Sequence, residues 1–276
     1  MTTWFITGVS RGLGLSLAKT ALAAGDTVVG TVRSGSPALS GAPGKLHILT
    51  VDLADGAAAE AAVTQAFERV GDIDAIVNNA GYGLLGALEK ATNAEAAHLF
   101  AVDVFAPFRI IRAALPYLRK QGSGHIINVT SIAGRAPGLG TALYSAAKAA
   151  LEALSASLAQ EVAPFGIKVT AVAPGAFRTD FLTDHSIRKS EAEDAAYADT
   201  IGKSGQAFNA MNGRQLGDPD RAARAIMTLV LSEKPPLHLL LGSDALQRAR
   251  AKLDAMIDEM DVWAVQTRAT DFVEEK

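Results

Sequence analysis

Three side chains in the middle of the sequence have the types and spacing for proton transfer. Tyr144 and Lys148 stand four residues apart, which places a phenol and an ammonium on one face of a helix. A free tyrosine has a pKa of about 10, and a neighbouring ammonium favours the phenolate, so we expect a lowered Tyr144 pKa. Ser131 stands 13 residues earlier, and its hydroxyl can donate to a carbonyl oxygen and stabilise a developing alkoxide.

A glycine-rich turn lies near the start of the chain. Thr7-Gly8-Val9-Ser10-Arg11-Gly12-Leu13-Gly14 follows an apolar run and precedes a segment with helical spacing. Glycines let the backbone approach a diphosphate closely, and the helix N-terminus offers free N–H groups and the positive end of its dipole. The turn therefore predicts a dinucleotide site, and the alternative is an ordinary turn between strand and helix.

These motifs together resemble the short-chain dehydrogenase/reductase family, in its single-domain branch, from Trp4 to about Leu241. Asp52 lies where the family residue contacts the adenine, Asn78-Asn79-Ala80-Gly81 matches a family tetrapeptide beside the cofactor, and Pro174-Gly175 with Thr179 resembles the segment that holds the nicotinamide carboxamide. The resemblance implies these cofactor-binding residues: Gly8, Ser10, Arg11, Gly12, Leu13, Gly14, Arg33, Asp52, Leu53, Asn79, Ala80, Gly81, Tyr144, Lys148, Pro174, Gly175 and Thr179.

The end of the second predicted strand indicates which dinucleotide binds. NAD-binding members carry an acidic residue about 20 positions beyond the glycines, where it takes the ribose hydroxyls. Here Arg33 stands 19 residues after Gly14, and a guanidinium can grip the 2′-phosphate of NADP with two parallel hydrogen bonds. Arg11 resembles the second basic residue of NADP-preferring members. We predict NADP rather than NAD; the alternative is that Arg33 is a solvated residue at a strand end.

The resemblance implies hydride transfer between NADP(H) and a carbonyl or alcohol substrate. Tyr144 would exchange the proton, Ser131 would orient the oxygen, and Lys148 would tune Tyr144 and hold the nicotinamide ribose. Asp103 occupies the place of the family's fourth catalytic residue, an asparagine whose backbone carbonyl holds a water in a proton relay. An aspartate can keep that role, and its charge would favour a protonated Lys148; the alternative is a substitution without consequence.

Alternating apolar runs and helical segments predict the fold. Seven short runs rich in Val, Ile and Leu read as buried strands: Trp4–Thr7, Thr27–Val32, Leu46–Val51, Ala75–Asn78, His125–Val129, Lys168–Val172 and His238–Leu241. Between them lie Ala-rich segments with helical spacing: Leu13–Ala24, Ala57–Val70, Ala94–Arg119 and Ala142–Ala163. This alternation predicts an α/β, Rossmann-like, doubly wound parallel sheet of seven strands with helices on both faces.

Two segments depart from this alternation. Residues 34–45 read as a surface loop, and residues 176–216 are polar and too long for a structureless connection, so we expect a mobile lid over the substrate. Its apolar residues are Phe181, Leu182, Ile187, Phe208 and Met211. We expect one domain over residues 1–276 with a C-terminal helical extension over about 243–276, in which Ala245–Val265 forms a solvated helix over the core.

Composition excludes several classes of function. The 276 residues carry a net charge of −3 without a basic stripe, so we expect no nucleic-acid partner. The absence of cysteine excludes disulfides, thiolate metal sites and cysteine nucleophiles. No apolar run reaches the roughly 18 residues that cross a bilayer and no signal peptide is visible, so we expect a cytoplasmic protein without a membrane partner. The five histidines are dispersed, so we expect no metal site.

Tyr82–Leu85 and Gly138–Thr141 flank the substrate by resemblance, and their apolar character predicts an apolar carbonyl or alcohol. His185 can touch substrate, although a solvated loop histidine is the alternative. The rival functions are a dinucleotide-binding regulatory protein with a lapsed site and a sugar-nucleotide epimerase or dehydratase of the extended branch. The resemblance also implies a homodimer or homotetramer joined through the helices at Ala94–Arg119 and Ala142–Ala163.

Overall fold

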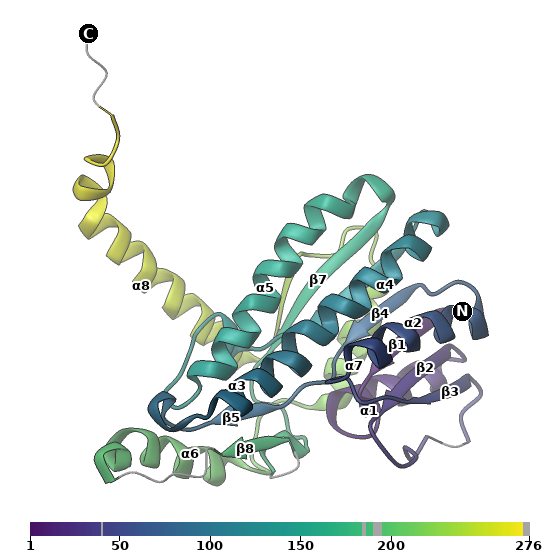
Figure 1. Ribbon diagram of the computed structural model, residues 1–276, viewed down its shortest axis with the longest axis horizontal. Coiled ribbons are helices and arrows are strands. Elements are labelled where there is room, and N and C mark those ends of the chain that lie inside the picture. The colour runs from purple at the N-terminus through teal and green to yellow at the C-terminus, as the bar shows by residue number, and fades with distance from the viewer. Residues whose placement is uncertain (40, 184–185, 190–194, 273–276) are drawn as a thin grey trace.

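A sheet of seven parallel strands forms the centre of the computed structural model, which describes residues 1–39, 41–183, 186–189 and 195–272. The strand order is β3-β2-β1-β4-β6-β7-β9, with helices around the sheet (Figure 1). The strands are β1 (Thr3–Thr7), β2 (Thr27–Val32), β3 (Lys45–Thr50), β4 (Ala75–Asn78), β6 (Gly124–Val129), β7 (Ile167–Pro174) and β9 (His238–Leu241). The predicted fold class, a doubly wound parallel sheet of seven strands, is confirmed.

Helices cover both faces of this sheet and bury two apolar cores. Trp4 and Ile6 of β1 pack with the helices on one face, whereas Phe5 between them packs with those on the other, as the alternation of strand side chains requires. The first face carries α1 (Gly12–Ala23) and α7 (Pro219–Leu231). The second carries α2 (Gly56–Val70), α4 (Ala106–Gln121) and α5 (Ala142–Val162).

The strand order reverses between β1 and β4. The chain runs outward through β2 to β3 at one edge, then returns to β4 and continues through β6 and β7 to β9 at the other edge. In open parallel sheets a crevice forms beyond the carboxyl ends of the strands at such a switch point. The residues that leave β1 and β4, Gly8 and Asn79, therefore meet at one place.

Side chains cap the N-termini of some helices, but not that of α1. Asp55 accepts hydrogen bonds from the first backbone N–H groups of α2, and Asp218 does the same for α7. Thr92 and Glu95 form a capping box at the start of α3 (Asn93–Phe100). Arg11, the N-cap residue of α1, makes no side-chain capping bond, so the first N–H groups of α1 receive no acceptor from that residue.

The predicted helix Ala94–Arg119 is interrupted. It begins as α3, widens into a π-helical turn over Ala101–Phe105, and continues as α4. The prediction of one regular helix is therefore wrong at this turn. A π-helical turn inserts an extra residue into the helix and is frequent at functional sites, and here it contains Asp103.

The segment 176–216 contains short elements around a small second sheet. Strand β8 (Ile187–Lys189) pairs in parallel with β5 (Gly83–Leu85), and neither strand was predicted. Helix α6 (Lys203–Met211) follows a π-helical turn at Ala198–Gly202. Single 3-10 turns occur here and elsewhere at Leu88–Lys90, Ile132–Gly134, Ala163–Phe165, Asp180–Leu182 and Ala195–Tyr197.

The C-terminal extension is helical over α8 (Ser243–Arg268). Only Ala245 and Ala249 of this helix are buried, and the rest projects away from the body of the molecule (Figure 1). The prediction that this helix lies over the core is therefore wrong beyond Ala249, because the core contacts end within its first two turns.

Candidate active site

One large cavity of about 710 Å³ lies beyond the carboxyl ends of the central strands. It brings together residues from both halves of the chain, from the glycine turn to the segment after β7. Of the predicted site residues, those that line it are Gly8, Ser10, Arg11, Gly12, Leu13, Arg33, Asp52, Leu53, Asn79, Ala80, Gly81, Ser131, Tyr144, Lys148, Pro174, Gly175 and Thr179. Gly14 and Asp103 do not line the cavity and lie behind its wall.

The glycine turn is held against the end of β4 by side-chain hydrogen bonds. The Thr7 hydroxyl accepts from the backbone N–H groups of Asn79 and Ala80, each at 3.0 Å, and the Asn79 amide donates to the Thr7 carbonyl at 2.9 Å. Gly8 adopts a φ of +75°, which side-chain-bearing residues rarely adopt. A Cβ on Gly14 would lie 2.3 Å from the Asn79 amide nitrogen, so Gly14 permits this contact.

Tyr144 and Lys148 lie one turn apart on α5, and Ser131 follows the end of β6. The side chains of Tyr144 and Lys148 reach the cavity although these residues are only 7% and 4% exposed. The Lys148 ammonium donates to the Val129 carbonyl at 3.2 Å and lies 5.8 Å from the centroid of the Tyr144 ring. The spacing in the sequence thus brings a phenol, an ammonium and a hydroxyl to one wall.

The electrostatics of Tyr144 differ from the expectation. Burial raises the pKa of Tyr144; the Lys148 ammonium and hydrogen bonding with Ser131 lower it, and the net direction is upward. For the protein alone, this direction is opposite to the expected lowering of the Tyr144 pKa. Lys148 lowers the Tyr144 pKa, as expected. Burial raises that pKa by more, because the loss of hydration destabilises the phenolate more than the ammonium stabilises it.

Asp103 touches the site through Lys148. One carboxylate oxygen lies 3.1 Å from the Lys148 Nζ, and the other accepts from the Tyr82 backbone N–H at 3.1 Å. Complete burial raises the pKa of Asp103 against the opposing effect of Lys148. Burial lowers the pKa of Lys148, but Asp103 and Tyr144 raise it, and the net direction is upward. Asp103 thus favours the ammonium form of Lys148.

The end of the cavity beside β2 is basic. Arg33 and Arg11 line the cavity there and are exposed. Within the described residues no carboxylate pairs with either guanidinium. Asp52 lies at the same end, where one of its oxygens accepts from the Ala54 backbone N–H at 3.0 Å. Both guanidinium groups are therefore available to an anionic ligand.

The opposite end of the cavity is mostly apolar. The predicted lid residues line it: Phe181, Leu182, Ile187, Phe208 and Met211. The Phe181 ring lies 6.0 Å from that of Tyr144 between centroids. The Arg188 guanidinium lies 4.9 Å from the centroid of the Tyr82 ring, and burial raises the pKa of Tyr82 to about 12.

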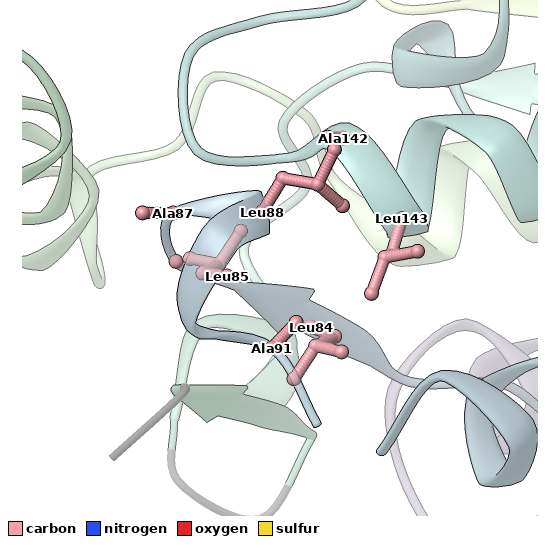
Figure 2. A pocket seen from close by; sticks show the side chains of 8 residues that line it. Leu84, Leu85, Ala87, Leu88, Ala91, Ala142 and Leu143 are labelled. Atoms are coloured by element: carbon pink, nitrogen blue, oxygen red, sulfur yellow. The ribbon is translucent and has the colours of Figure 1, made fainter. Parts of the chain in front are cut away.

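A second, small pocket adjoins this apolar end. Figure 2 shows its side chains, which come from β5, the loop after it and the start of α5: Leu84, Leu85, Ala87, Leu88, Ala91, Ala142 and Leu143. Leu85 lines both this pocket and the large cavity. The flanking segments predicted from resemblance also reach the large cavity, at Tyr82, Gly83, Leu85, Gly138 and Thr141.

Gln215 belongs to no motif and was not predicted. This residue is 2% exposed and lines the large cavity, and neither its side-chain nitrogen nor its side-chain oxygen has a hydrogen-bond partner within the described protein. A buried amide without partners costs about 1–3 kcal/mol. Gln215 is therefore placed to bind a polar group of a ligand. A lone glutamine in a polar segment has no sequence signal for this role.

A polar cluster behind Ser131, in which Thr130 and Glu152 are buried, was also missed. Thr130, the residue before Ser131, donates to the Glu152 carboxylate on α5. The Arg135 Nε and the His238 Nδ1 lie 3.0 and 3.1 Å from the same carboxylate. The cluster joins β6, α5 and β9 and so fixes the segment that carries Ser131.

His185, for which a contact with substrate was predicted, lies outside the described residues. Over the described ranges, no group of three or more His, Asp or Glu residues is arranged to hold a metal ion. The described helices include none that is long and apolar enough to span a bilayer.

Comparisons with known proteins identify the family. The family model described as short chain dehydrogenase matches residues 2–190. Oxidoreductase BOA17 of Botryotinia fuckeliana is 34% identical over 264 residues, which cover 94% of this chain and 96% of that protein.

Solved structures agree with this match. A short-chain dehydrogenase from Streptomyces avermitilis is similar with a TM-score of 0.91 and 40% identity, covering 98% of this chain and 100% of that chain. More distant structures hold either cofactor: a metagenomic short-chain oxidoreductase is in complex with NADP (27% identity, TM-score 0.69, 87% and 96% covered), and a Brucella melitensis reductase with NADH (26%, 0.72, 87% and 96%). The chain therefore belongs to the short-chain dehydrogenase/reductase family and is an oxidoreductase.

Proposed function

We propose that this protein transfers a hydride between NADP(H) and a carbonyl or alcohol substrate, as a carbonyl reductase or alcohol dehydrogenase. One observation carries the proposal: Ser131, Tyr144 and Lys148 open on the same cavity as the glycine turn. A dinucleotide held on that turn would reach toward the phenol and the hydroxyl. A regulatory protein that only senses a dinucleotide would need none of these three side chains.

The residues of the cavity fit a dinucleotide. Arg11 leaves the start of α1 without a side-chain cap, as a diphosphate site at a helix N-terminus requires. Asp52 and Leu53 would contact the adenine, the segment Asn79–Gly81 would lie along the cofactor, and Pro174, Gly175 and Thr179 would hold the nicotinamide carboxamide. The unpartnered amide of Gln215 supports a polar ligand in the same cavity.

Arg33 and Arg11 favour NADP over NAD. Neither guanidinium pairs with a carboxylate of the described chain, and no acidic residue follows β2 directly. A 2′-phosphate would meet two cations there, and hydrogen bonds between charged groups contribute about 1.5–3 kcal/mol each.

Tyr144 is the acid–base group in this proposal. The bound cofactor supplies or accepts the hydride. Ser131 donates a hydrogen bond to the substrate oxygen, and Tyr144 gives that oxygen a proton in reduction and removes it in oxidation. Since burial raises the Tyr144 pKa, the phenol is the stable form and is ready to donate. Lys148 favours the phenolate when the reaction runs as oxidation.

Asp103 acts on this chemistry through Lys148. Its carboxylate lies 3.1 Å from the ammonium and does not line the cavity, so it is a positioning residue for Lys148. We also assign it the place of the family asparagine in the proton relay, through its backbone carbonyl.

The substrate is a small molecule with an apolar body. Phe181, Leu182, Phe208 and Met211 belong to the segment 176–216, which we propose closes over the substrate as a lid. Arg188 lines the same cavity, with its guanidinium over the Tyr82 ring, and would bind an anionic group of the substrate. The homodimer or homotetramer would form through the segments Ala94–Arg119 and Ala142–Ala163, and the exposure of Phe105 and Phe108 in the first of these supports a partner there.

The test is oxidation of NADPH, followed by its absorbance, across a panel of aliphatic and aromatic ketones and aldehydes. We expect turnover of apolar members with NADPH and a much lower kcat/KM with NADH. A higher kcat/KM with NADH would contradict the NADP assignment. Tight binding of NADPH without turnover of any carbonyl or alcohol would favour the regulatory function.

A further inference from the structure

Gln215 lies near the end of the segment 176–216, shortly before α7, and its buried side chain has unused hydrogen-bonding capacity. The residue is 2% exposed, lines the large cavity, and has no partner for its side-chain nitrogen or oxygen within the described protein. Buried polar groups in proteins are normally satisfied, because an unsatisfied one is costly. Since the amide N–H group and the amide oxygen both lack a partner, the ligand group that completes this site has to accept and donate a hydrogen bond at once.

Hydrogen bonds fasten the chain around Gln215 to the segment that ends β7 and follows it. The Gly217 backbone N–H donates to the Ala176 carbonyl at 3.0 Å, and the Arg178 backbone N–H donates to the Gly217 carbonyl at 2.8 Å. The Arg178 guanidinium also donates to the Gln215 carbonyl at 3.1 Å. Gln215 therefore lies beside residues 174–179, the segment proposed to hold the nicotinamide carboxamide.

The same segment borders the glycine turn. A Cβ on Gly12 would lie 3.8 Å from the Cβ of Thr179, and both residues line the large cavity. A dinucleotide with its diphosphate on the turn would thus pass directly along residues 174–179. Its nicotinamide half would come into the part of the cavity that Gln215 lines.

We propose that Gln215 binds the carboxamide of the nicotinamide ring through two hydrogen bonds. The Gln215 N–H group donates to the carboxamide oxygen, and the carboxamide N–H group donates to the Gln215 oxygen. A carboxamide carries a donor beside an acceptor in one plane, which matches the glutamine amide atom for atom, so the pair satisfies both unpartnered atoms of Gln215. This inference rests on the proposed function, since it takes NADP(H) as the ligand.

The other ligand groups of the proposed reaction fit Gln215 less well. The diphosphate and the oxygen of a ketone or aldehyde accept hydrogen bonds and donate none, so either would leave the Gln215 oxygen without a partner. The hydroxyl of an alcohol substrate can do both, but in the proposed reaction it binds Ser131 and Tyr144. The hydroxyls of the nicotinamide ribose are likewise expected to bind Lys148. The carboxamide is the group that remains.

Calorimetric titration with NADP and with 2′-phospho-ADP-ribose, which lacks the nicotinamide ring, tests which part of the cofactor meets Gln215. Gln215→Leu should raise the Kd for NADP about 10-fold and leave the Kd for 2′-phospho-ADP-ribose unchanged. Gln65→Leu is the matched control, since Gln65 is exposed on α2 and does not line the cavity, and it should change neither Kd. An equal rise for both ligands in Gln215→Leu would overturn the proposal, as would an unchanged Kd for NADP.

A third ligand tests the hydrogen bonds in the unaltered protein, without reliance on the fold of a variant. The 3-acetylpyridine analogue of NADP has a methyl group in place of the amide NH₂ group and cannot donate to the Gln215 oxygen. The unaltered protein should bind it about 5-fold more weakly than NADP, and Gln215→Leu should reduce this difference. Equal affinities in the unaltered protein, or a difference that Gln215→Leu leaves intact, would contradict the pairing. Failure of the unaltered protein to bind NADP or NADPH at all would instead contradict the proposed function itself.

Discussion

Replacement of Lys148 by methionine tests how the site controls Tyr144. Methionine keeps the apolar length of the side chain and removes the ammonium, which lies 5.8 Å from the centroid of the Tyr144 ring. Because that ammonium lowers the pKa of Tyr144 against the effect of burial, its loss should raise the Tyr144 pKa further. The direction follows from the charge alone.

The magnitude follows from the distance. At an effective dielectric constant of about 20, a unit charge at that distance contributes about 3 kcal/mol, or about 2 pKa units. Asp103 would lose its partner at 3.1 Å and become easier to protonate, which returns part of the effect because its charge also raises the Tyr144 pKa. We therefore expect a rise of about 1–2 units.

The assay is kcat/KM for alcohol oxidation as a function of pH at saturating NADP. Oxidation needs the phenolate, so the rate rises with pH through the Tyr144 pKa, and this acidic limb should move to higher pH by about 1–2 units in the variant. Lys168→Met is a matched control, since the Lys168 ammonium donates to the Ser232 carbonyl at the C-terminal end of α7 and its loss should leave the limb in place. A limb that stays fixed, or moves to lower pH, in Lys148→Met would refute the reasoning.

Three further predictions concern the walls of the cavity. Arg33→Asp should lower kcat/KM with NADPH about 100-fold and raise it with NADH, because a carboxylate repels the 2′-phosphate. Steady-state kinetics with both cofactors would test this, and an unchanged cofactor preference would contradict it. Gln215→Leu should raise the KM of either the cofactor or the substrate about 10-fold without lowering Tm, since it removes an unpartnered buried amide. Unchanged KM values for both ligands would show that Gln215 binds neither. Asp103→Asn should move the acidic limb of oxidation to lower pH, because the Asp103 charge raises the Tyr144 pKa; an unchanged profile would show that this charge does not reach Tyr144.

The central sheet could be predicted because its strands are buried on both faces. Ile76 and Ile126 lie in continuous apolar runs with no polar alternation, and both are almost completely buried in the core. Ser131, Tyr144 and Lys148 could be predicted because they lie close together in the sequence: Tyr144 and Lys148 stand on one helix, and Ser131 follows the strand before it. Local spacing is visible in a sequence, and the fold then brings the separate segments to one cavity.

Other features depend on contacts that spacing does not encode. The apolar residues around Asp103 are spaced as in a regular helix, so the sequence pattern does not reveal the extra residue of the π-helical turn. The rise in the Tyr144 pKa results from burial, which competes with the Lys148 charge and is not visible in the motif. The course of α8 was missed because amphipathic spacing shows that a face exists and not which surface covers it.

Tyr144→Phe is the most direct test of hydride transfer with Tyr144 as the acid–base group. The variant keeps the ring in its buried position and removes only the hydroxyl. We expect turnover with NADPH and a responsive ketone to fall about 10²–10⁴-fold, while the Kd for NADPH, measured by its fluorescence, changes by less than a few fold. Turnover near that of the unaltered protein, with the same Kd, would contradict the account.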